Sequence, residues 1–384
     1  MEILEDYNPW WYSDNWEKED KHIKLWKSQK YRWIPEWLDE LSLEPFSLNF
    51  VIGPRQVGKT TGLKLLIKQL IKSEIPPERI TFLSCDIFTD MKELRDILFE
   101  YAEVKKGILI LDEITSVEYW WKIVKALIDL GKLENHVVIV SGSSAVKLFK
   151  FYEAFSGRMG KGKRLEVLPL SFPEYIKVLH EKAYGTKLKV LFERYLKTGG
   201  FPRSINEDKS FLEDLIISID REISRIGKDP KISRKVIYSV IKKAPSAVSY
   251  SALGKEVELN HITTREYLEL LEDLFILGIS FWKDKDVNFK KEKKIFLRDP
   301  FIAKVFAEIY NLELRRDFLY EWIVQEHLLR KYGEIYYYRN KYEIDILAGD
   351  LKIEVKAGKP HRKYPRDVLV LDEENLPRFL MNLF

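Results

Sequence analysis

Eight consecutive residues near position 55 have the types and spacing of a loop that binds nucleotide phosphates. Gly53-Pro54-Arg55-Gln56-Val57-Gly58-Lys59-Thr60 matches G-x-x-x-x-G-K-[ST] in full, and Thr61 follows it. Glycines let the backbone wrap closely, so that amide N–H groups point at phosphates from a helix N-terminus. Lys59 would reach the β- and γ-phosphates, and the Thr60 hydroxyl would bind Mg²⁺. Residues 53–61 are therefore predicted to hold a nucleotide.

A buried strand that ends in two acids supplies the partner that such a loop needs. Residues 107–111 are apolar after the first glycine, and Asp112 and Glu113 follow directly. Asp112 is placed to hold Mg²⁺ through water, and Glu113 to polarise the attacking water as a general base. The alternative is an acidic N-cap pair that opens the helix after Thr115. Together with the loop, the pair predicts ATP hydrolysis.

Two further polar residues are candidates for the same site. Ser141 ends the apolar run 137–140, where a polar side chain can position water or sense the γ-phosphate; a Ser/Gly turn that caps the next helix is the alternative. Arg158 stands in a glycine-punctuated basic loop, where it could neutralise transition-state charge in cis or from a neighbouring subunit. A solvated basic loop is the alternative for Arg158.

Near the C-terminus a predicted hairpin brings two carboxylates together. Gly349-Asp350 is a turn signal, and folding about it sets Asp345 opposite Glu354, ~5 Å apart at Cβ, with Lys356 on the same face. Opposed like charges are destabilising unless something positive lies between them. A divalent metal would serve, with Lys356 orienting a hydrolytic water. The alternative is neutralisation by nearby lysines, namely Lys341, Lys352 and Lys356.

The elements that must position these groups alternate in type. Short apolar runs predict strands at 48–52, 80–85, 108–111 and 137–140, and 3.6-residue periodicity predicts helices at 60–73, 91–101 and 116–130. Strands that are apolar on both faces are typical of a parallel sheet buried between helices. Residues 46–230 are therefore predicted to be an α/β phosphate-loop core with a helical lid.

After residue 230 the pattern changes to that of a winged helix over 231–300. Helices are predicted at 232–243, 251–257 and 262–274, and a hairpin at 275–298. The first turn of the third helix, residues 261–265, could read bases, although four acids follow it, so contact with protein is the alternative. The hairpin carries six lysines that could contact phosphate: Lys283, Lys285, Lys290, Lys291, Lys293 and Lys294.

Composition limits the class of protein. One cysteine, Cys85, excludes a disulfide framework and any thiolate metal cluster. No apolar run approaches the ~18 residues of a membrane span, and the first residues are too acidic for a signal peptide. We expect a cytoplasmic chain with no membrane partner. The charged fraction of 32% with four glutamines is typical of thermophiles, whereas the net charge of +4 does not decide whether nucleic acid binds.

The first 45 residues form an arm rich in tryptophan. They hold six of the ten tryptophans and carry a net charge of −5. Negative charge repels nucleic-acid phosphate, so we expect the arm to pack on the next domain rather than to stack on bases.

The chain resembles archaeal and bacterial AAA+-type ATPases, of an AAA_14-like kind, that carry a DUF4143-type C-terminal region. The resemblance rests on GPRQVGKTT at 53–61, LILDEI at 109–114, SGSSAVKL at 141–148, SGR at 156–158, LPLSFPEY at 168–175, GGFPR at 199–203, LEDLFILG at 271–278, FLRDP at 296–300, EIYYYRNKYEIDIL at 334–347 and IEVKAG at 353–358. It implies phosphate binding by residues of the loop, magnesium and water handling by Asp112 and Glu113, and an arginine-finger role for Arg158.

The last segment, 301–384, resembles the PD-(D/E)XK nuclease core. The pattern here is Asp345…Glu354-Val355-Lys356, and the upstream helical acid of that core is matched best by Glu321, with Glu326 second. We therefore expect an ATP- and Mg²⁺-dependent AAA+-type ATPase, with a homo-oligomer and nucleic acid as partners. The alternatives are a nucleotide-dependent switch that controls protein partners, and an ATP-gated nuclease with a second divalent metal at the C-terminal site.

Overall fold

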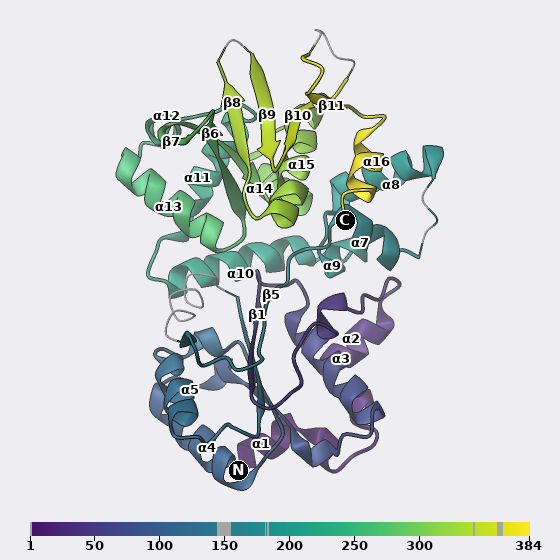
Figure 1. Ribbon diagram of the computed structural model, residues 1–384, viewed down its shortest axis with the longest axis vertical. Helices are drawn as coiled ribbons and strands as arrows, with labels where there is room; N and C mark the ends of the chain where they lie inside the picture. The colour runs from purple at the N-terminus through teal and green to yellow at the C-terminus, as the bar shows by residue number, and fades with distance from the viewer. Residues whose placement is uncertain (1, 144–154, 181, 183, 341, 359–363) are drawn as a thin grey trace. The chain divides into compact units, whose positions relative to one another are not determined.

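The computed structural model of the chain describes residues 2–143, 155–180, 182, 184–340, 342–358 and 364–384. They fall into two compact units, Met1–Leu168 and Pro169–Phe384, which are described separately (Figure 1). Two features of the sequence lie outside the described residues: the motif at 141–148 from Ser144 onward, and Lys341.

Unit 1 is a parallel five-stranded sheet between two layers of helices, which confirms the predicted α/β core. The strand order is β2-β3-β4-β1-β5, and all neighbouring strands pair in parallel. The strands are β1 (Ser47–Ile52), β2 (Ile80–Ser84), β3 (Ile108–Asp112), β4 (Val137–Gly142) and β5 (Arg164–Glu166). The helices are α1 (Glu2–Tyr7), α2 (Lys21–Ser28), α3 (Lys59–Lys72), α4 (Met91–Val104) and α5 (Trp120–Asp129).

Helices cover both faces of this sheet, because the crossover after β1 runs to one side and those after β2 and β3 to the other. Figure 1 shows α2 and α3 on one face and α4 and α5 on the opposite face. Every residue of β1, β3 and β4 is buried as a result, as the apolar runs predicted. Helix α5 begins later than expected because Tyr119 has φ 58°, which an α-helix cannot include.

The N-terminal arm packs on unit 1, as its composition predicted. The buried Asn8 side chain donates to the Phe82 carbonyl (2.9 Å) and accepts from the Phe82 N–H (2.6 Å), so it pairs with the outer edge of β2 as a neighbouring strand would. The Trp10 and Trp11 indoles both donate to the Ile80 carbonyl at 2.9 Å. The arm therefore covers an edge strand that would otherwise expose unpaired backbone groups.

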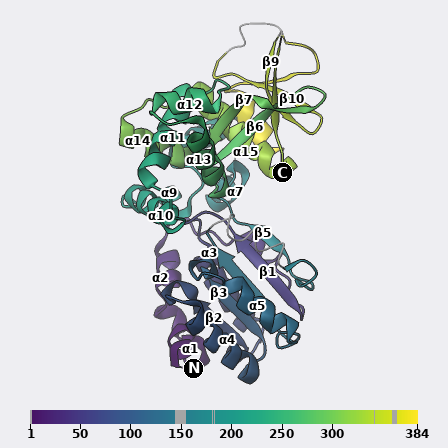
Figure 2. The same cartoon turned by 90° about the vertical axis from the view of Figure 1, so that its left-hand side faces the viewer.

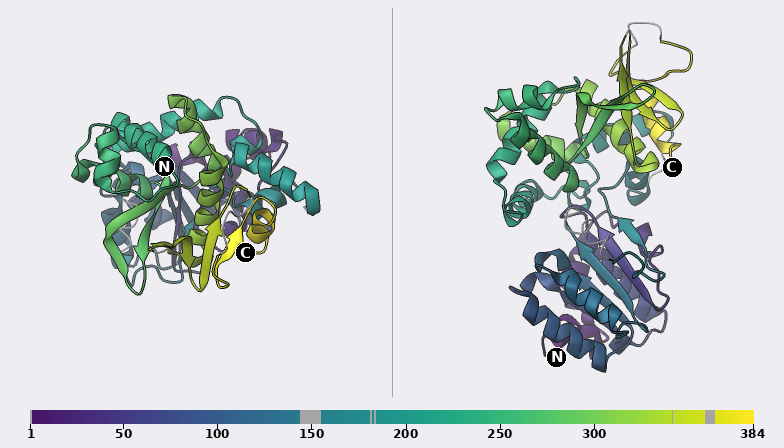
Figure 3. Two further views of the ribbon diagram at one scale, coloured as in Figure 1. Left: turned by 90° about the horizontal axis from the view of Figure 1, so that it is seen from above. Right: turned by 60° about the vertical axis from the view of Figure 1, so that its left-hand side comes forward.

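Unit 2 is built on a six-stranded mixed sheet in the order β11-β10-β9-β8-β6-β7. Its strands are β6 (Leu277–Lys283), β7 (Val287–Leu297), β8 (Tyr336–Arg339), β9 (Glu343–Ala348), β10 (Leu351–Val355) and β11 (Leu369–Leu371). Its helices are α7 (Phe172–Val178), α8 (Gly185–Thr198), α9 (Pro202–Ile205), α10 (Phe211–Arg225), α11 (Pro230–Lys243), α12 (Tyr250–Glu256), α13 (His261–Asp273), α14 (Pro300–Tyr310), α15 (Arg316–Tyr332) and α16 (Leu376–Met381). Helix α16, yellow in Figures 1 and 3, lies against α7 and α8. Among the described residues, none of the helices combines the length and apolar character needed to cross a lipid bilayer.

The predicted three helices and hairpin are present at 230–297. Helices α11, α12 and α13 pack side by side, with α13 against β6 (Figure 2). Strand β6 also pairs with β8 (Phe281 with Tyr336 and Trp282 with Tyr337), so the hairpin is part of the larger sheet. One sheet thus runs through the segments 231–300 and 301–384, and the boundary between them stays a prediction.

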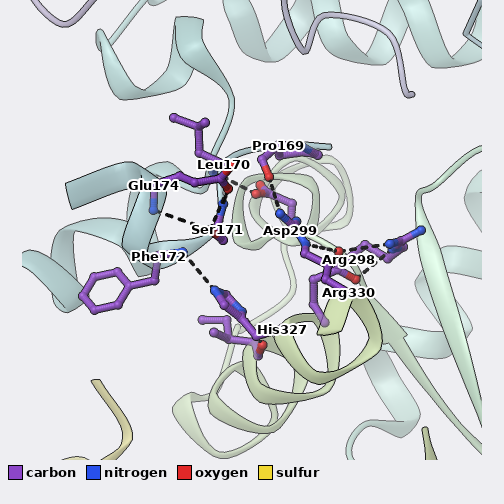
Figure 4. A network of polar contacts seen from close by, with 12 residues as sticks. Pro169, Leu170, Ser171, Phe172, Glu174, Arg298, Asp299, His327 and Arg330 are labelled. Atoms are coloured by element: carbon purple, nitrogen blue, oxygen red, sulfur yellow. Dashed lines mark hydrogen bonds and ion pairs between the residues drawn. The ribbon is translucent and has the colours of Figure 1, made fainter. Parts of the chain in front are cut away.

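The start of unit 2 is held by buried polar side chains (Figure 4). The Phe172 N–H donates to His327 Nε2 (2.9 Å), the Tyr195 hydroxyl donates to the Leu170 carbonyl (3.0 Å), and Arg330 donates to the Pro169 carbonyl (2.7 Å). His327 can accept at Nε2 only as the neutral ring, and its Nδ1 lies 2.7 Å from the Ile323 carbonyl. Burial, with a smaller contribution from the Arg330 charge, lowers the pKa of His327 to about 4.

The buried, neutral His327 ring predicts a loss of stability in acid. The unfolded chain protonates His327 near pH 6.5, the folded chain only near pH 4, so the free energy of unfolding should fall between these values. Urea denaturation at pH 7 and pH 4.5 should show a loss about 2 kcal/mol larger for the wild type than for His327→Gln. Burial raises the pKa of Asp299 to about 6, which acts in the opposite sense, but Asp299 is present in both proteins. Equal losses would contradict the assignment.

Candidate nucleotide site

The phosphate-loop motif forms the turn between β1 and α3. Its nine residues run from Gly53 to Thr61, and the last three of them begin α3. Two backbone positions have positive φ, Gln56 at 68° and Gly58 at 92°. The Lys59 amine is buried and donates to the carbonyls of Gly53 (2.8 Å) and Pro54 (2.9 Å), so it lies inside the curve of the loop.

Gly53 is required by packing as well as by the loop. A Cβ atom at this position would lie 1.8 Å from the Val167 carbonyl oxygen. Val167 follows β5, and its N–H donates to the Ile52 carbonyl at 2.7 Å. The segment after β5 therefore adjoins the phosphate loop, which no local pattern in the sequence indicated.

Asp112 is the centre of the polar contacts in this site. It is buried at the carboxyl end of β3, where it accepts a hydrogen bond from Thr60 Oγ1 (2.7 Å) and another from the Ser141 hydroxyl. Burial, and secondarily the adjacent Glu113 charge, raises the pKa of the Asp112 carboxyl, and the two hydroxyls oppose that rise. The loop and the ends of β3 and β4 are thereby linked through one carboxylate.

Glu113 follows in a left-handed conformation, with φ 50° and ψ 37°. Its N–H donates to Ser141 Oγ at 3.0 Å, and its Oε1 lies 3.9 Å from the Lys59 amine. Its side chain makes no capping bond to the helical turn at 114–116, so the N-cap interpretation is not realised. Its other carboxylate oxygen, Oε2, is buried and accepts no hydrogen bond from the described residues.

Arg158 lies near the amino-terminal end of β1, opposite to the end that carries the phosphate loop. Its Nε donates to Asp129 Oδ1 (2.7 Å) at the end of α5, and the neighbouring Met159 and Gly160 pair with the first residues of β1. The phosphate loop follows the last residue of β1, about 20 Å away at ~3.3 Å per residue. Arg158 is therefore remote from the loop of its own unit, and an arginine-finger role from a neighbouring subunit stays a prediction.

The C-terminal hairpin has the predicted register. Ala348 pairs with Leu351 and Ile346 with Ile353 across the turn. Asp345, Glu354 and Lys356 line one pocket of about 460 Å³, and Glu321 of α15 joins them, as predicted. The backup acid, Glu326, lies instead between Arg298 and Arg330, with which it forms ion pairs of 2.8 Å and 2.7 Å.

In this pocket a lysine lies among the acids that were considered as ligands of a second metal. Positive charge is supplied by Lys294 of β7, whose buried amine contacts Glu321, Glu343 and Asp345. Among the described residues, no group of three or more His, Cys, Asp or Glu side chains has the geometry to hold a metal ion. The sequence contains a signal for the burial of Lys294, which directly precedes the apolar run 295–297, but none for its acidic partners.

Two of the six hairpin lysines are internal and cannot meet phosphate there. Lys293 is buried and donates to the Phe289 carbonyl (2.8 Å), and Lys294 is in the acidic pocket. In the first turn of α13, Arg265 is paired with Glu269 at 2.6 Å. The hairpin and α13 thus offer less positive charge to a duplex than the sequence indicated.

The fold and the loop are those of a P-loop core on a parallel α/β sheet, followed by a mixed-sheet α/β domain. Residues 46–176 match the family described as AAA domain (AAA_14), and residues 189–313 match a domain of unknown function (DUF8612). The C-terminal match is thus to DUF8612, whereas a DUF4143-type region was expected.

Two relatives are described as uncharacterized. The protein MJ1544 of Methanocaldococcus jannaschii is 26% identical over 345 residues, which cover 80% of this chain and 73% of that protein. A protein of Haemophilus influenzae is 26% identical over 262 residues, which cover 63% of each.

Solved structures of low similarity also match. They include the Aeropyrum pernix ORC2 protein (TM-score 0.41, 11% identity, 70% of this chain and 89% of that chain) and a Thermotoga maritima RuvB variant (TM-score 0.34, 15% identity, 70% and 88%). These scores are too low to carry an argument about partners.

The contacts of Ser141 predict a measurable contribution to stability. Ser141→Ala removes a hydrogen bond to the buried Asp112 carboxylate and leaves the Glu113 N–H without its acceptor. We expect the free energy of unfolding to fall by about 1.5–3 kcal/mol in chemical denaturation. Ser84→Ala is the matched control, since Ser84 ends β2 at the same edge and its hydroxyl bonds to the exposed Asp86. A loss no larger than in this control would show that the contact is unimportant.

Proposed function

We propose that the chain is a Mg²⁺-dependent ATPase that acts on, or is regulated by, nucleic acid. The observation that carries the ATPase part is the set of contacts around Asp112. A single carboxylate joins the phosphate loop, through Thr60, to the end of β4, through Ser141. This arrangement sets a magnesium ligand, a loop lysine and a second acid within one site.

Each residue of the site in unit 1 has its own role in this proposal. Lys59 exchanges its two carbonyl acceptors in the loop for phosphate oxygens, and loop N–H groups at the start of α3 donate to the same phosphates. Thr60 Oγ1 and, through water, Asp112 would hold magnesium, which would neutralise charge that develops on the β- and γ-phosphate oxygens. Glu113 takes a proton from the attacking water through its buried Oε2. The Ser141 hydroxyl oxygen orients Glu113 by accepting a hydrogen bond from the Glu113 N–H.

Replacement of the proposed base separates binding from hydrolysis. Glu113→Gln keeps the shape of the side chain and removes its basicity, so phosphate release should fall by about 10²–10⁴-fold while ATP is still retained in filter binding. Lys59→Ala is the comparison, because it should lose ATP binding itself. Wild-type rates in Glu113→Gln would refute the role of Glu113. Wild-type turnover far below ~1 per second with tight ATP retention would instead indicate a nucleotide-dependent switch.

The nucleic-acid part is supported by a face of unit 2 where aromatic rings alternate with lysines. Trp282 of β6 stacks on Tyr338 of β8 (ring centroids 6.0 Å apart), and Tyr338 contacts Tyr342 at 5.6 Å. Lys283 lies 4.2 Å above the Tyr336 ring, and Lys291 lies 5.6 Å from the Trp282 ring. We call the rings of Trp282, Tyr336, Tyr338 and Tyr342 the aromatic face.

This face favours a single strand over a duplex. Unstacked bases can stack on exposed rings while lysines follow the phosphates, whereas a duplex hides its bases and needs more charge than the hairpin presents. The neighbouring hairpin tip adds a hollow of about 580 Å³ lined by Trp282, Lys285, Phe289 and Lys290, and the Phe289 side chain is 67% exposed.

Removal of the central ring tests this partner. Trp282→Ala should weaken binding of a fluorescent oligothymidine by about 10-fold in anisotropy titrations, because stacking contributes ~1–3 kcal/mol per base. Tyr184→Ala removes a ring of unit 2 outside the aromatic face, 79% exposed, and should bind as the wild type does. ATP hydrolysis by the wild type should rise with the oligonucleotide. Equal affinities for the two variants, or stronger binding of duplex, would contradict the assignment.

A further inference from the structure

The acidic pocket of unit 2 contains an amine at its centre. Lys294 Nζ lies 2.7 Å from Asp345 Oδ1, 2.9 Å from Glu321 Oε1 and 3.3 Å from Glu343 Oε1. Its side chain is 3% exposed, and those of Glu321 and Asp345 are 6% and 7% exposed. Two strands separate β7 from β9 in the sheet, so this contact joins segments that are not neighbours in the strand order.

The oxygens that a metal would need are engaged with donors. Asp345 accepts from Lys294 at Oδ1 and from the Val355 N–H at Oδ2 (2.9 Å). Glu321 Oε1 accepts from Lys294 and, at 3.2 Å, from Gln325 Nε2. A divalent cation binds carboxylate oxygens at about 2.0–2.6 Å, which would set it against the ammonium on the same oxygens.

Glu354, another acid of the pocket, has its own cation. Glu354 Oε1 lies 2.7 Å from the Lys356 amine and 3.2 Å from the Tyr364 hydroxyl. Lys356, which in a nuclease-type site would act on water or phosphate, is therefore directed at a carboxylate. Each acid of the Asp345–Glu354 pair thus has a lysine partner.

The balance of burial and charge favours this arrangement over a neutral lysine. Burial alone would lower the pKa of the Lys294 amine, but the carboxylates of Glu321, Asp345 and Glu343 more than offset it, so the pKa is raised and the amine stays charged. A buried charge that loses its partner is strongly destabilising, which opposes displacement of the amine by a metal.

From these contacts we propose that Lys294 is an internal cation that takes the place of a divalent metal, so that the nuclease-like pocket binds none until the amine is removed. The pocket is then a structural ion cluster that joins β7 and β9 to α15. The inference is independent of ATP hydrolysis, because it concerns unit 2 alone.

Manganese binding to the full chain without nucleotide tests the proposal. Free Mn²⁺ is measured by its electron paramagnetic resonance signal for wild type, Asp345→Asn, Lys294→Met and the double variant Lys294→Met/Asp345→Asn. We expect equal Mn²⁺ stoichiometry for wild type and Asp345→Asn. Lys294→Met should bind one additional Mn²⁺ per chain, and the double variant should lose it.

Two controls make each result decisive. Lys293→Met removes the neighbouring buried lysine, which donates to a backbone carbonyl outside the pocket, and it should gain no Mn²⁺. Near-ultraviolet circular dichroism reports whether each variant folds. A wild-type site that Asp345→Asn removes would overturn the proposal, as would a folded Lys294→Met with no gain. If Lys294→Met does not fold, the comparison of wild type with Asp345→Asn decides alone.

Discussion

The nucleotide site depends on one buried carboxylate whose charge is held but not cancelled. Asp112 is surrounded by hydroxyl donors, Thr60 from the first turn of α3 and Ser141 from β4. Hydroxyls stabilise a negative charge without adding a positive one, and they can rotate when a ligand enters. The parallel sheet makes this possible, because it brings the carboxyl ends of β1, β3 and β4 to one edge. The arm that covers β2 and the helices on both faces preserve that sheet.

The core and its loop could be predicted from the sequence because their signals are local. Apolar runs gave β1 to β4 to within two residues at each end, and the glycine-lysine-threonine spacing placed the turn after β1. The sequence predicted that Ser141 belongs to the site but not that it contacts Asp112. That contact requires β3 and β4 to be neighbours, and strand order is not encoded locally. The distance of Arg158 from the loop likewise depends on how the chain returns to the start of β1.

In unit 2 the hairpin register followed from Gly349-Asp350, but the counter-ion did not. A run of lysines around 290–294 predicts an exposed tip, because charged residues are seldom buried. The end of β7 is covered on both faces, however. The backbone of Lys293 pairs with Val248, and the Lys294 amine meets carboxylates 27 and 51 positions away. Such long-range compensation has no sequence pattern that a single chain reveals.

The two units therefore stabilise buried carboxylates in different ways, and this difference decides whether each site can bind a divalent cation. A carboxylate at a strand end that is compensated by neutral donors retains a full negative charge, so a dication adds attraction. A carboxylate compensated by an ammonium has already gained that attraction, and a dication must first displace a buried lysine. Acidic residues in a nuclease-like pattern are consequently weak evidence for metal. The cations that the fold can bring to the same oxygens must be counted first, and here Lys294 and Lys356 already serve Asp345 and Glu354.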